Sequence, residues 1–324
     1  MSNNKRYTHI HKKIQEWYEN YGRVTLPWRN TESAYKIYLS EIMLQQTQVK
    51  TVIERFYSPF LEKFPTFKAV AEASEDDVLK AWEGLGYYTR ARNLHKTAQL
   101  TQGVLPSTAK ELEKLSGIGK STAHAVACFA FKEPLPILDA NVKRILYRFF
   151  AITKCNDKVL WEKTYELFDV KNSYIYNQAM MDIGSTICTH KNPKCQECPF
   201  ETLCQGKKTP LEYPNKKITK KRPIKDHFMI IYSQDNRYGL AQNSTKLLGG
   251  LWGFKQIEDF KVENNDKLLG NFTHHYTHFK LNITLILSSK RVESLKYFTL
   301  KEIDNLALSR ADRKAIEILR QSIE

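Results

Sequence analysis

LPSTAKELEKLSGIGKSTAHAVACFAFKEPLPILDANVKR, residues 105–144, places two short helical patterns on either side of a glycine-bearing turn. Thr108 and Glu111 have the spacing of a capping box at the start of the first helix. Gly117 and Gly119 lie in the turn, where the missing side chains let backbone N–H groups at a helix N-terminus approach an anion such as a DNA phosphate. An ordinary helical hairpin would show the same pattern, so the turn alone leaves both interpretations open.

The composition narrows the classes of partner. The chain has 324 residues, enough for two domains, and 42% of them are hydrophobic. Its 50 Lys and Arg against 35 Asp and Glu give a formal net charge of +15, which favours a polyanionic partner, nucleic acid first and an anionic membrane second. No apolar run is long enough to span a bilayer, and the polar start is not a signal peptide. We therefore expect a protein of the bacterial cytoplasm, or of the nucleus or an organelle in a eukaryote, whose cysteines are reduced or metal-bound.

Two acidic residues stand in apolar surroundings. Glu41 lies among aliphatic residues of a predicted helix over 35–49, and Asp139 follows an apolar approach twenty residues after the glycine turn. A buried carboxyl group without a cation has a raised pKa and donates a proton near neutral pH, whereas a glutamate at the polar edge of a helix does not. Spacing alone leaves both readings of Glu41 open.

A polar run and an aromatic turn are candidates for nucleic-acid contact. Gln46 and Thr47 belong to a run of hydrogen-bonding residues that interrupts the apolar helix, which suits contact with base edges or a solvated turn. Tyr87 and Tyr88 follow a glycine turn and precede Arg90 and Arg92. One tyrosine would wedge between bases while the arginines bind phosphates, although aromatic pairs also occur in ordinary cores.

Four cysteines fall within seventeen residues, with the spacing C-x6-C-x2-C-x5-C: Cys188, Cys195, Cys198 and Cys204. Such a group in a reducing compartment predicts metal ligands rather than disulfides. An iron–sulfur cluster and a tetrahedral zinc ion both fit this spacing.

The pattern of the chain changes after a segment rich in lysine and proline. Residues 1–206 are predicted to be helical, and 207–226 to be a basic linker. Residues 227–324 contain strand patterns and end in a predicted helix over 310–322, which indicates an α+β domain.

Seven motifs in order give the chain its resemblance to a known family: LPWR, SEIMLQQTQV, GLGYYTRARNLH, LSGIGKSTA, ILDANVKR, NQAMMDIG and the cysteine loop. Together they resemble the adenine DNA glycosylase (MutY) family of the helix–hairpin–helix glycosylase superfamily. The resemblance implies a multidomain protein. It would have an all-α helix–hairpin–helix glycosylase domain with a [4Fe–4S] loop and an α+β MutT-like (Nudix-fold) C-terminal domain. The helical domain would comprise a six-helix barrel module at about 24–133 and an iron–sulfur module from the N-terminal helix and about 134–206.

The resemblance also assigns roles to individual residues. Glu41 takes the place of the general acid that protonates adenine N7, and Asp139 that of the carboxylate that stabilises the oxocarbenium ion or captures C1′. Asn141 and Ser121 are expected to support the site. The adenine pocket is implied to be lined by Leu26, Trp28, Arg29 and Asp182. The family's DNA and lesion contacts fall on Gln46, Thr47, Tyr87, Gly117, Gly119 and Lys143. The cluster ligands would be Cys188, Cys195, Cys198 and Cys204.

Ser121 distinguishes two reactions within this superfamily. Relatives resembling endonuclease III have a lysine here that attacks C1′ and also cuts the strand, whereas a hydroxyl group cannot form that Schiff base. We therefore expect a monofunctional glycosylase, in which water completes the reaction and Lys120, one residue along the helix, points to another face. The alternatives are a bifunctional glycosylase/lyase for oxidised pyrimidines, a non-catalytic iron–sulfur DNA-binding protein, and a nucleotide hydrolase, for which the C-terminal domain lacks the metal-binding box.

The C-terminal domain of the family reads 8-oxoguanine through a Phe-Ser-His loop. Tyr276, Thr277 and His278 are the corresponding residues here, and threonine keeps the hydroxyl group while tyrosine keeps the aromatic ring. The expected partner is double-stranded DNA with an 8-oxoguanine:adenine mispair. We expect the protein to bind it as a monomer and to have no membrane partner.

Overall fold

A computed structural model describes residues 7–215, 222–245 and 247–323. The chain divides into two compact units. The first comprises residues 1–46 and 104–218, and the second comprises 47–103 and 219–324. Part of the predicted basic linker, residues 216–221, lies outside the described residues.

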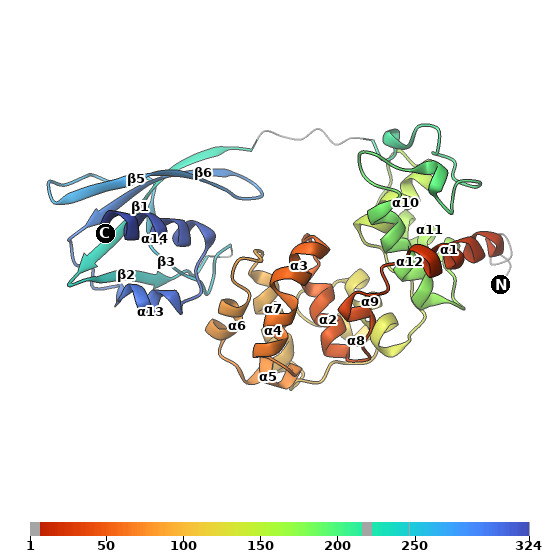
Figure 1. Cartoon of the computed structure of the whole chain (residues 1–324), viewed down its shortest axis with the longest axis horizontal. Coiled ribbons are helices and arrows are strands. Elements are labelled where there is room, and N and C mark those ends of the chain that lie inside the picture. Colours follow the sequence, from red (N-terminus) through yellow and green to blue (C-terminus); the bar gives the residue numbers. More distant parts are fainter. Residues whose placement is uncertain (1–6, 216–221, 246, 324) are drawn as a thin grey trace. The chain divides into compact units, whose positions relative to one another are not determined.

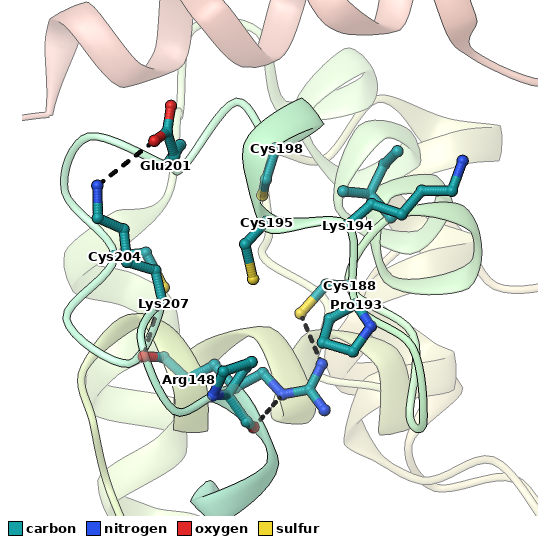
Figure 2. Close-up of a pocket in the computed structure, with 11 residues that line it drawn as sticks. Arg148, Cys188, Pro193, Lys194, Cys195, Cys198, Glu201, Cys204 and Lys207 are labelled. Atoms are coloured by element: carbon teal, nitrogen blue, oxygen red, sulfur yellow. Dashed lines mark hydrogen bonds and ion pairs between the residues drawn. The ribbon is translucent and has the colours of Figure 1, made fainter.

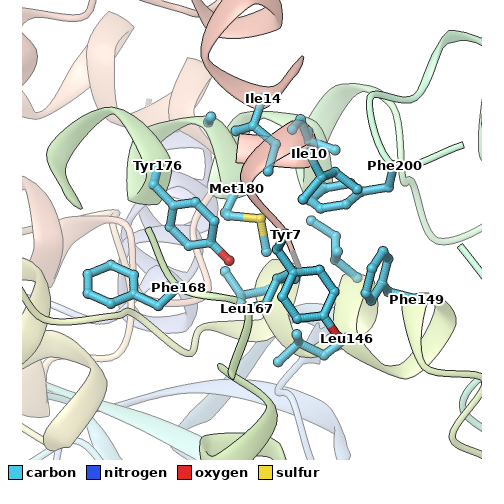
Figure 3. Close-up of a cluster of buried hydrophobic side chains, with 14 of the residues drawn as sticks. Tyr7, Ile10, Ile14, Leu146, Phe149, Leu167, Phe168, Tyr176, Met180 and Phe200 are labelled. Atoms are coloured by element: carbon cyan, nitrogen blue, oxygen red, sulfur yellow. The ribbon is translucent and has the colours of Figure 1, made fainter. Parts of the chain in front are cut away.

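The first unit is helical. Its helices and 3-10 turns are α1 (Thr8–Tyr21), η2 (Pro27–Arg29), α2 (Ala34–Met43), α8 (Ala109–Leu112), α9 (Lys120–Phe131), α10 (Ala140–Phe149), α11 (Asp157–Leu167), α12 (Ser173–Thr186), η3 (Cys195–Glu197) and η4 (Pro210–Glu212). Ile10 and Ile14 of α1 pack against Leu146 of α10 and Met180 of α12 in one buried cluster, which Phe200 of the cysteine loop joins (Figure 3). This core holds α10 and the cysteine loop together.

The predicted helical hairpin forms, with a very short first helix. The Thr108 hydroxyl accepts a hydrogen bond from the Glu111 amide (3.3 Å), which caps α8 as expected. The Glu111 carboxylate accepts a bond from the Thr108 hydroxyl (2.8 Å), so only the threonine half of the predicted capping box matches. Gly117 has φ +78°, a left-handed conformation that favours glycine and turns the chain into α9.

The predicted helix over 35–49 is shorter than its apolar pattern suggests. Helix α2 ends at Met43, and a new helix, α3 (Val49–Arg55), begins after a turn. Gln46 lies in this turn with φ +57°, a left-handed conformation that no α-helix contains. The polar run therefore separates two helices and presents Gln46 to solvent.

The second unit contains helices and a mixed sheet. Besides α3 it has α4 (Tyr57–Lys63), α5 (Phe67–Glu72), α6 (Glu75–Ala81), α7 (Thr89–Leu100), α13 (Leu300–Asp304) and α14 (Arg310–Ile323). The strands are β1 (Ile224–Gln234), β2 (Arg237–Gln242), β3 (Trp252–Gly253), β4 (Lys255–Ile257), β5 (Asp266–His275), β6 (Lys280–Ser288) and β7 (Lys296–Phe298). The strands follow the order β3-β2-β1-β6-β5, with β1 and β6 parallel and the others antiparallel.

The predicted C-terminal helix is confirmed as α14, which packs on this sheet (Figure 1). Its buried residues Ala311, Ala315 and Leu319 recur at helical spacing and face the apolar side of the strands. The loop between β5 and β6 carries residues 276–279. In the described part of the chain, no helix has both the length and the apolar character that a bilayer span requires.

Candidate active site and metal centre

Glu41 occupies the apolar helix α2. The helix begins after Ser33, whose hydroxyl accepts a hydrogen bond from the Lys36 amide (3.4 Å), and nearly all its other residues are buried. Burial and the nearby charge of Asp139 raise the pKa of Glu41 to about 7, while Arg29 opposes the shift. Because of this raised pKa, Glu41 can hold a proton near neutral pH. Part of its surface remains exposed, which keeps the group accessible to a ligand.

Asp139 caps helix α10. Its Oδ1 accepts a hydrogen bond from the Val142 amide (2.7 Å), and its Oδ2 accepts one from Asn141 Nδ2 (3.3 Å). Burial raises the pKa of Asp139, while these donors and the charge of Arg144 act in the opposite direction. The hydrogen-bond donors at Asp139 oppose the rise in its pKa, and the charge of Asp139 reinforces the rise in the pKa of Glu41.

The backbone that leads into Asp139 is held by side chains from two helices. Ser121 Oγ of α9 accepts a hydrogen bond from the Leu138 amide (3.2 Å), and Asn177 Oδ1 of α12 accepts one from the Ile137 amide (3.1 Å). A lysine at position 121 could not accept the first of these bonds. Ser121 therefore positions the segment that leads into Asp139.

Asn141 connects Asp139 to helix α12 and the cysteine loop. Its Oδ1 accepts a hydrogen bond from Arg144 Nη2 (2.9 Å), and Arg144 also donates to the Gly184 carbonyl and, through Nε, to the Cys188 carbonyl (2.7 Å). A Cβ atom on Gly184 would lie 2.5 Å from Asn141 Cβ, so only glycine allows this approach. The sequence did not predict a role for Gly184 or Arg144. The contacts of Gly184 with Asn141, and of Arg144 with Gly184 and Cys188, join residues that are distant in the chain.

The four residues of the implied adenine pocket are all buried. Leu26 and Trp28 are 8% and 6% exposed, and the side chains of Arg29 and Asp182 are 4% and 0% exposed. Arg29 Nη1 and Nη2 donate to the two oxygens of Asp182 at 2.7 and 2.8 Å. Asp182 also binds Arg23, which the sequence reading did not single out. The Asp182 oxygens are thus occupied by arginines.

The four cysteines line one pocket together with Arg148 of α10. In Figure 2 the sulfurs of Cys188, Cys195 and Cys198 are directed into the same space. Arg148 Nη1 donates to Cys188 Sγ (3.3 Å) and to the Thr189 carbonyl (2.7 Å). Over the described residues, no three Cys, His, Asp or Glu side chains are gathered closely enough for a single metal ion.

The predicted lesion elements meet within the second unit. Tyr87 is 42% exposed with φ +50°, and its hydroxyl lies 3.3 Å from the Thr277 hydroxyl of the β5–β6 loop. Thr277 and His278 are exposed. Tyr276 is half-buried and stacks on Phe279 with ring centroids 4.6 Å apart.

Arg90 was expected to bind phosphates, and the structure shows that this expectation was wrong. The residue is 7% exposed, lies over the rings of Trp82 and Tyr87, and donates to Thr47 Oγ1 (3.2 Å). Burial lowers its pKa to about 10. Arg90 therefore contacts the ring of Tyr87 and the hydroxyl of Thr47 from a buried position. Tyr88, the other candidate wedge, is buried as well.

The lysines near the hairpin are engaged within the first unit. Lys120 Nζ lies 4.2 Å from the centroid of Trp161, which confirms that it points to a face other than that of Ser121. Lys143 forms an ion pair with Asp157 (2.8 Å). Gly119, by contrast, borders open space, where a Cβ atom would meet nothing within 4 Å.

Two family profiles match the chain. The profile of the HhH-GPD superfamily base excision DNA repair proteins matches residues 39–169, and the NUDIX domain profile matches residues 227–318. The first match spans Glu41, the hairpin and Asp139, and the second spans the sheet and most of α14.

Curated relatives cover the chain more completely. An adenine DNA glycosylase of Buchnera aphidicola subsp. Baizongia pistaciae is 38% identical over 301 residues, which are 86% of this chain and 85% of the relative. Another from the subspecies Acyrthosiphon pisum is 34% identical over 341 residues, 96% of this chain and 97% of the relative. The adenine DNA glycosylase of Homo sapiens is 38% identical over 212 residues, 60% of this chain and 38% of the human protein.

Solved structures resemble the helical part. A thermostable thymine-DNA glycosylase superposes with a TM-score of 0.58 at 28% identity, over 64% of this chain and 99% of the other. A non-covalent endonuclease III–DNA complex gives a TM-score of 0.55 at 19% identity, over 64% and 97%, and shares the fold.

Proposed function

Because this chain belongs to the adenine DNA glycosylase family, hydrolases that act on N-glycosyl bonds in base excision repair, we propose a finer function within that family. The protein removes adenine mispaired with 8-oxoguanine or guanine in duplex DNA, acts on a flipped-out nucleotide as a monomer, and leaves the strand intact. It would work wherever the genome lies, in the bacterial cytoplasm or a eukaryotic nucleus or organelle. The observation that carries the proposal is the pair Glu41 and Asp139: burial raises the pKa of Glu41 to about 7, and Asp139 accepts hydrogen bonds from Val142 and Asn141 that favour its anion.

The reaction begins with proton transfer from Glu41 to N7 of adenine, which makes the base a neutral leaving group. The bond between C1′ and N9 then breaks, its electrons remain on adenine, and the sugar becomes an oxocarbenium ion. The Asp139 anion, held by Val142 and Asn141, stabilises that cation or captures C1′. Water supplies the oxygen at C1′, and the proton that it loses restores the acid.

The absence of strand cleavage is proposed from position 121. Ser121 offers no amine, and its hydroxyl is bonded to the Leu138 amide. The neighbouring Lys120 lies against Trp161, and Lys143 is paired with Asp157. Either lysine would have to leave its present partner before its amine could form a Schiff base at C1′.

Recognition of 8-oxoguanine is assigned to the β5–β6 loop and Tyr87. The exposed Thr277 supplies a hydroxyl that can donate or accept a hydrogen bond, and Tyr87 presents an exposed ring on a left-handed turn. A tyrosine ring of this kind can wedge into the base stack beside the mispair. Since the two hydroxyls already lie 3.3 Å apart, one lesion base could contact both.

The cysteine pocket is proposed to hold a [4Fe–4S] cluster through Cys188, Cys195, Cys198 and Cys204. When bound, the cluster would supply a covalent cross-link for the loop, with no part in proton transfer or bond cleavage. Arg148 would donate to the Cys188 sulfur, as it does in the structure, and so offset the negative charge of the thiolates.

An end-labelled duplex with one 8-oxoguanine:adenine pair tests the function. Incubation followed by alkali should cleave the adenine strand at the mispair, and omission of alkali should leave it uncut. No alkali-labile site would refute the glycosylase proposal. Cleavage without alkali, together with efficient borohydride trapping, would instead support the glycosylase/lyase alternative.

A further inference from the structure

Arg23 joins Arg29 on a single buried carboxylate. The Arg23 amide donates to Asp182 Oδ2 (2.8 Å), and its Nε donates to Oδ1 (2.7 Å), while its Nη2 lies 2.6 Å from Oδ1. Arg29 binds the same two oxygens through Nη1 and Nη2. Asp182 is fully buried, Arg29 is nearly so, and the Arg23 side chain is 29% exposed. The triad is therefore arranged in depth, with Arg23 towards the solvent.

The triad has a surplus of one positive charge and one unused donor. Two guanidinium groups share a single carboxylate, so the charges do not cancel. Within the described residues, Arg29 Nε is buried and has no hydrogen-bond partner. A buried unpaired N–H group is costly, and such groups are rare in folded proteins unless a ligand satisfies them. This donor lies on the 3-10 turn that packs against α2, the helix of Glu41.

We propose that Arg23 is a positioning residue for base removal, which together with Asp182 fixes the Arg29 guanidinium beside Glu41 so that its free Nε–H binds the purine. The inference rests on the proposed function, because it needs a purine in this pocket. A substitution of Arg23 keeps the backbone amide that donates to Asp182 Oδ2, but it removes the two side-chain donors to Oδ1 that prevent rotation of the carboxylate. Arg29 then remains bound to a carboxylate that is free to turn, and its Nε loses its fixed direction.

The charge of the triad also acts on the acid. Arg29 opposes the rise in the pKa of Glu41, and Asp139 reinforces it. The titratable side chains of α9, which packs against α2, have other partners: Lys120 on Trp161, His124 at the Pro136 carbonyl and Cys128 at Asn177. The triad is thus the cationic group whose removal changes the field at Glu41.

Four variants of the full-length protein test the inference in single-turnover assays of adenine release between pH 5.5 and 9. R23Q removes the charge and the fork, R23K keeps the charge alone, D182N removes the anion, and R237Q is the control for loss of a surface arginine, since Arg237 pairs with the exposed Glu302. Binding to the abasic product duplex and thermal midpoints are measured in parallel.

R23Q should slow adenine release roughly tenfold or more while product affinity matches that of R237Q. Because Glu41 must be protonated to act, the rate falls as pH rises through its pKa. That descending limb should move to higher pH in R23Q, to lower pH in D182N, and remain in place in the slower R23K. These opposite directions exclude a general loss of structure, which would lower both rates without moving the limb in two directions.

Two results would overturn the inference: an R23Q rate within about twofold of wild type, or limbs of R23Q and D182N that move together or stay fixed. Should R23Q not fold, the same decision rests on R23K against D182N. Absence of adenine release by the wild-type protein would instead refute the proposed function, so the two failures are distinguishable.

Discussion

Glu41→Gln is expected to make the protein more stable at pH 8 and inactive across the pH range. The folded protein holds this carboxyl at a pKa of about 7 against an ordinary 4.5. A pKa shift of one unit corresponds to about 1.4 kcal/mol, so the full shift corresponds to about 3.5 kcal/mol. Since Glu41 keeps part of its surface exposed, solvent screening reduces the net effect to about 1–3 kcal/mol.

The sign follows from proton binding. Between pH 4.5 and 7 the folded protein binds more protons at Glu41 than the unfolded chain does, so its stability falls as pH rises through this window. The loss is absent below the unfolded pKa and complete above about pH 7. Glutamine resembles the protonated acid and does not titrate, which removes this term.

The measurement is the difference between the thermal midpoints of the variant and the wild type as a function of pH. We expect almost no difference at pH 4.5 and a gain of several degrees for the variant by pH 8, at about 2 °C per kcal/mol. Subtraction cancels the other titrating groups. The same variant should lose at least about 100-fold in single-turnover adenine release, because the general acid is gone. A difference in midpoint that does not change with pH would refute the reasoning about burial, whatever the activity.

Three further variants test other parts of the site. Gly184→Ala should lower single-turnover adenine release at least about tenfold, because its Cβ would lie 2.5 Å from Asn141 Cβ, while the neighbouring Ser185→Ala should stay near wild type. Equal rates for the two would remove Gly184 from the support of the site. Cys198→Ser should abolish the broad visible absorbance expected of a cluster and lower the iron content of purified protein, and a colourless, zinc-containing wild type would contradict the cluster. Thr277→Ala should reduce the preference for 8-oxoguanine:adenine over guanine:adenine duplexes, with recovery in Thr277→Ser; an unchanged preference would exclude this hydroxyl from recognition.

Local patterns predicted the elements that a few neighbouring residues determine. The apolar spacing of residues 310–322 predicted α14, and the alternating pattern after residue 281 predicted β6. The hairpin sequence likewise predicted the turn in which Gly117 lies. Where the apolar pattern continued past a break, it was misleading, as at the turn around Gln46.

Roles that depend on distant partners could not be predicted in this way. Arg90 follows an exposed aromatic turn, a pattern typical of a phosphate contact, yet the fold buries it under Tyr87. Asp182 is a lone acidic residue on an apolar helix, and its partners Arg23 and Arg29 lie more than 150 residues away. No periodicity connects such residues, so only the packing of α12 against the N-terminal part of the chain reveals the triad.

Helix α10 explains why a cysteine loop belongs to a site whose chemistry is hydrolytic. Asp139 caps its first turn, and Arg148 lies nine residues later at the cysteine pocket, about 14 Å along the helix axis at 1.5 Å per residue. Arg144, between them, binds both Asn141 and the Cys188 carbonyl. A displacement of the loop would therefore change the donor that holds Asp139, although no cysteine approaches the reacting bond. Because a misplacement of about 1 Å at a reacting group can cost about 100-fold in rate, we expect order in the loop to contribute to catalysis through geometry.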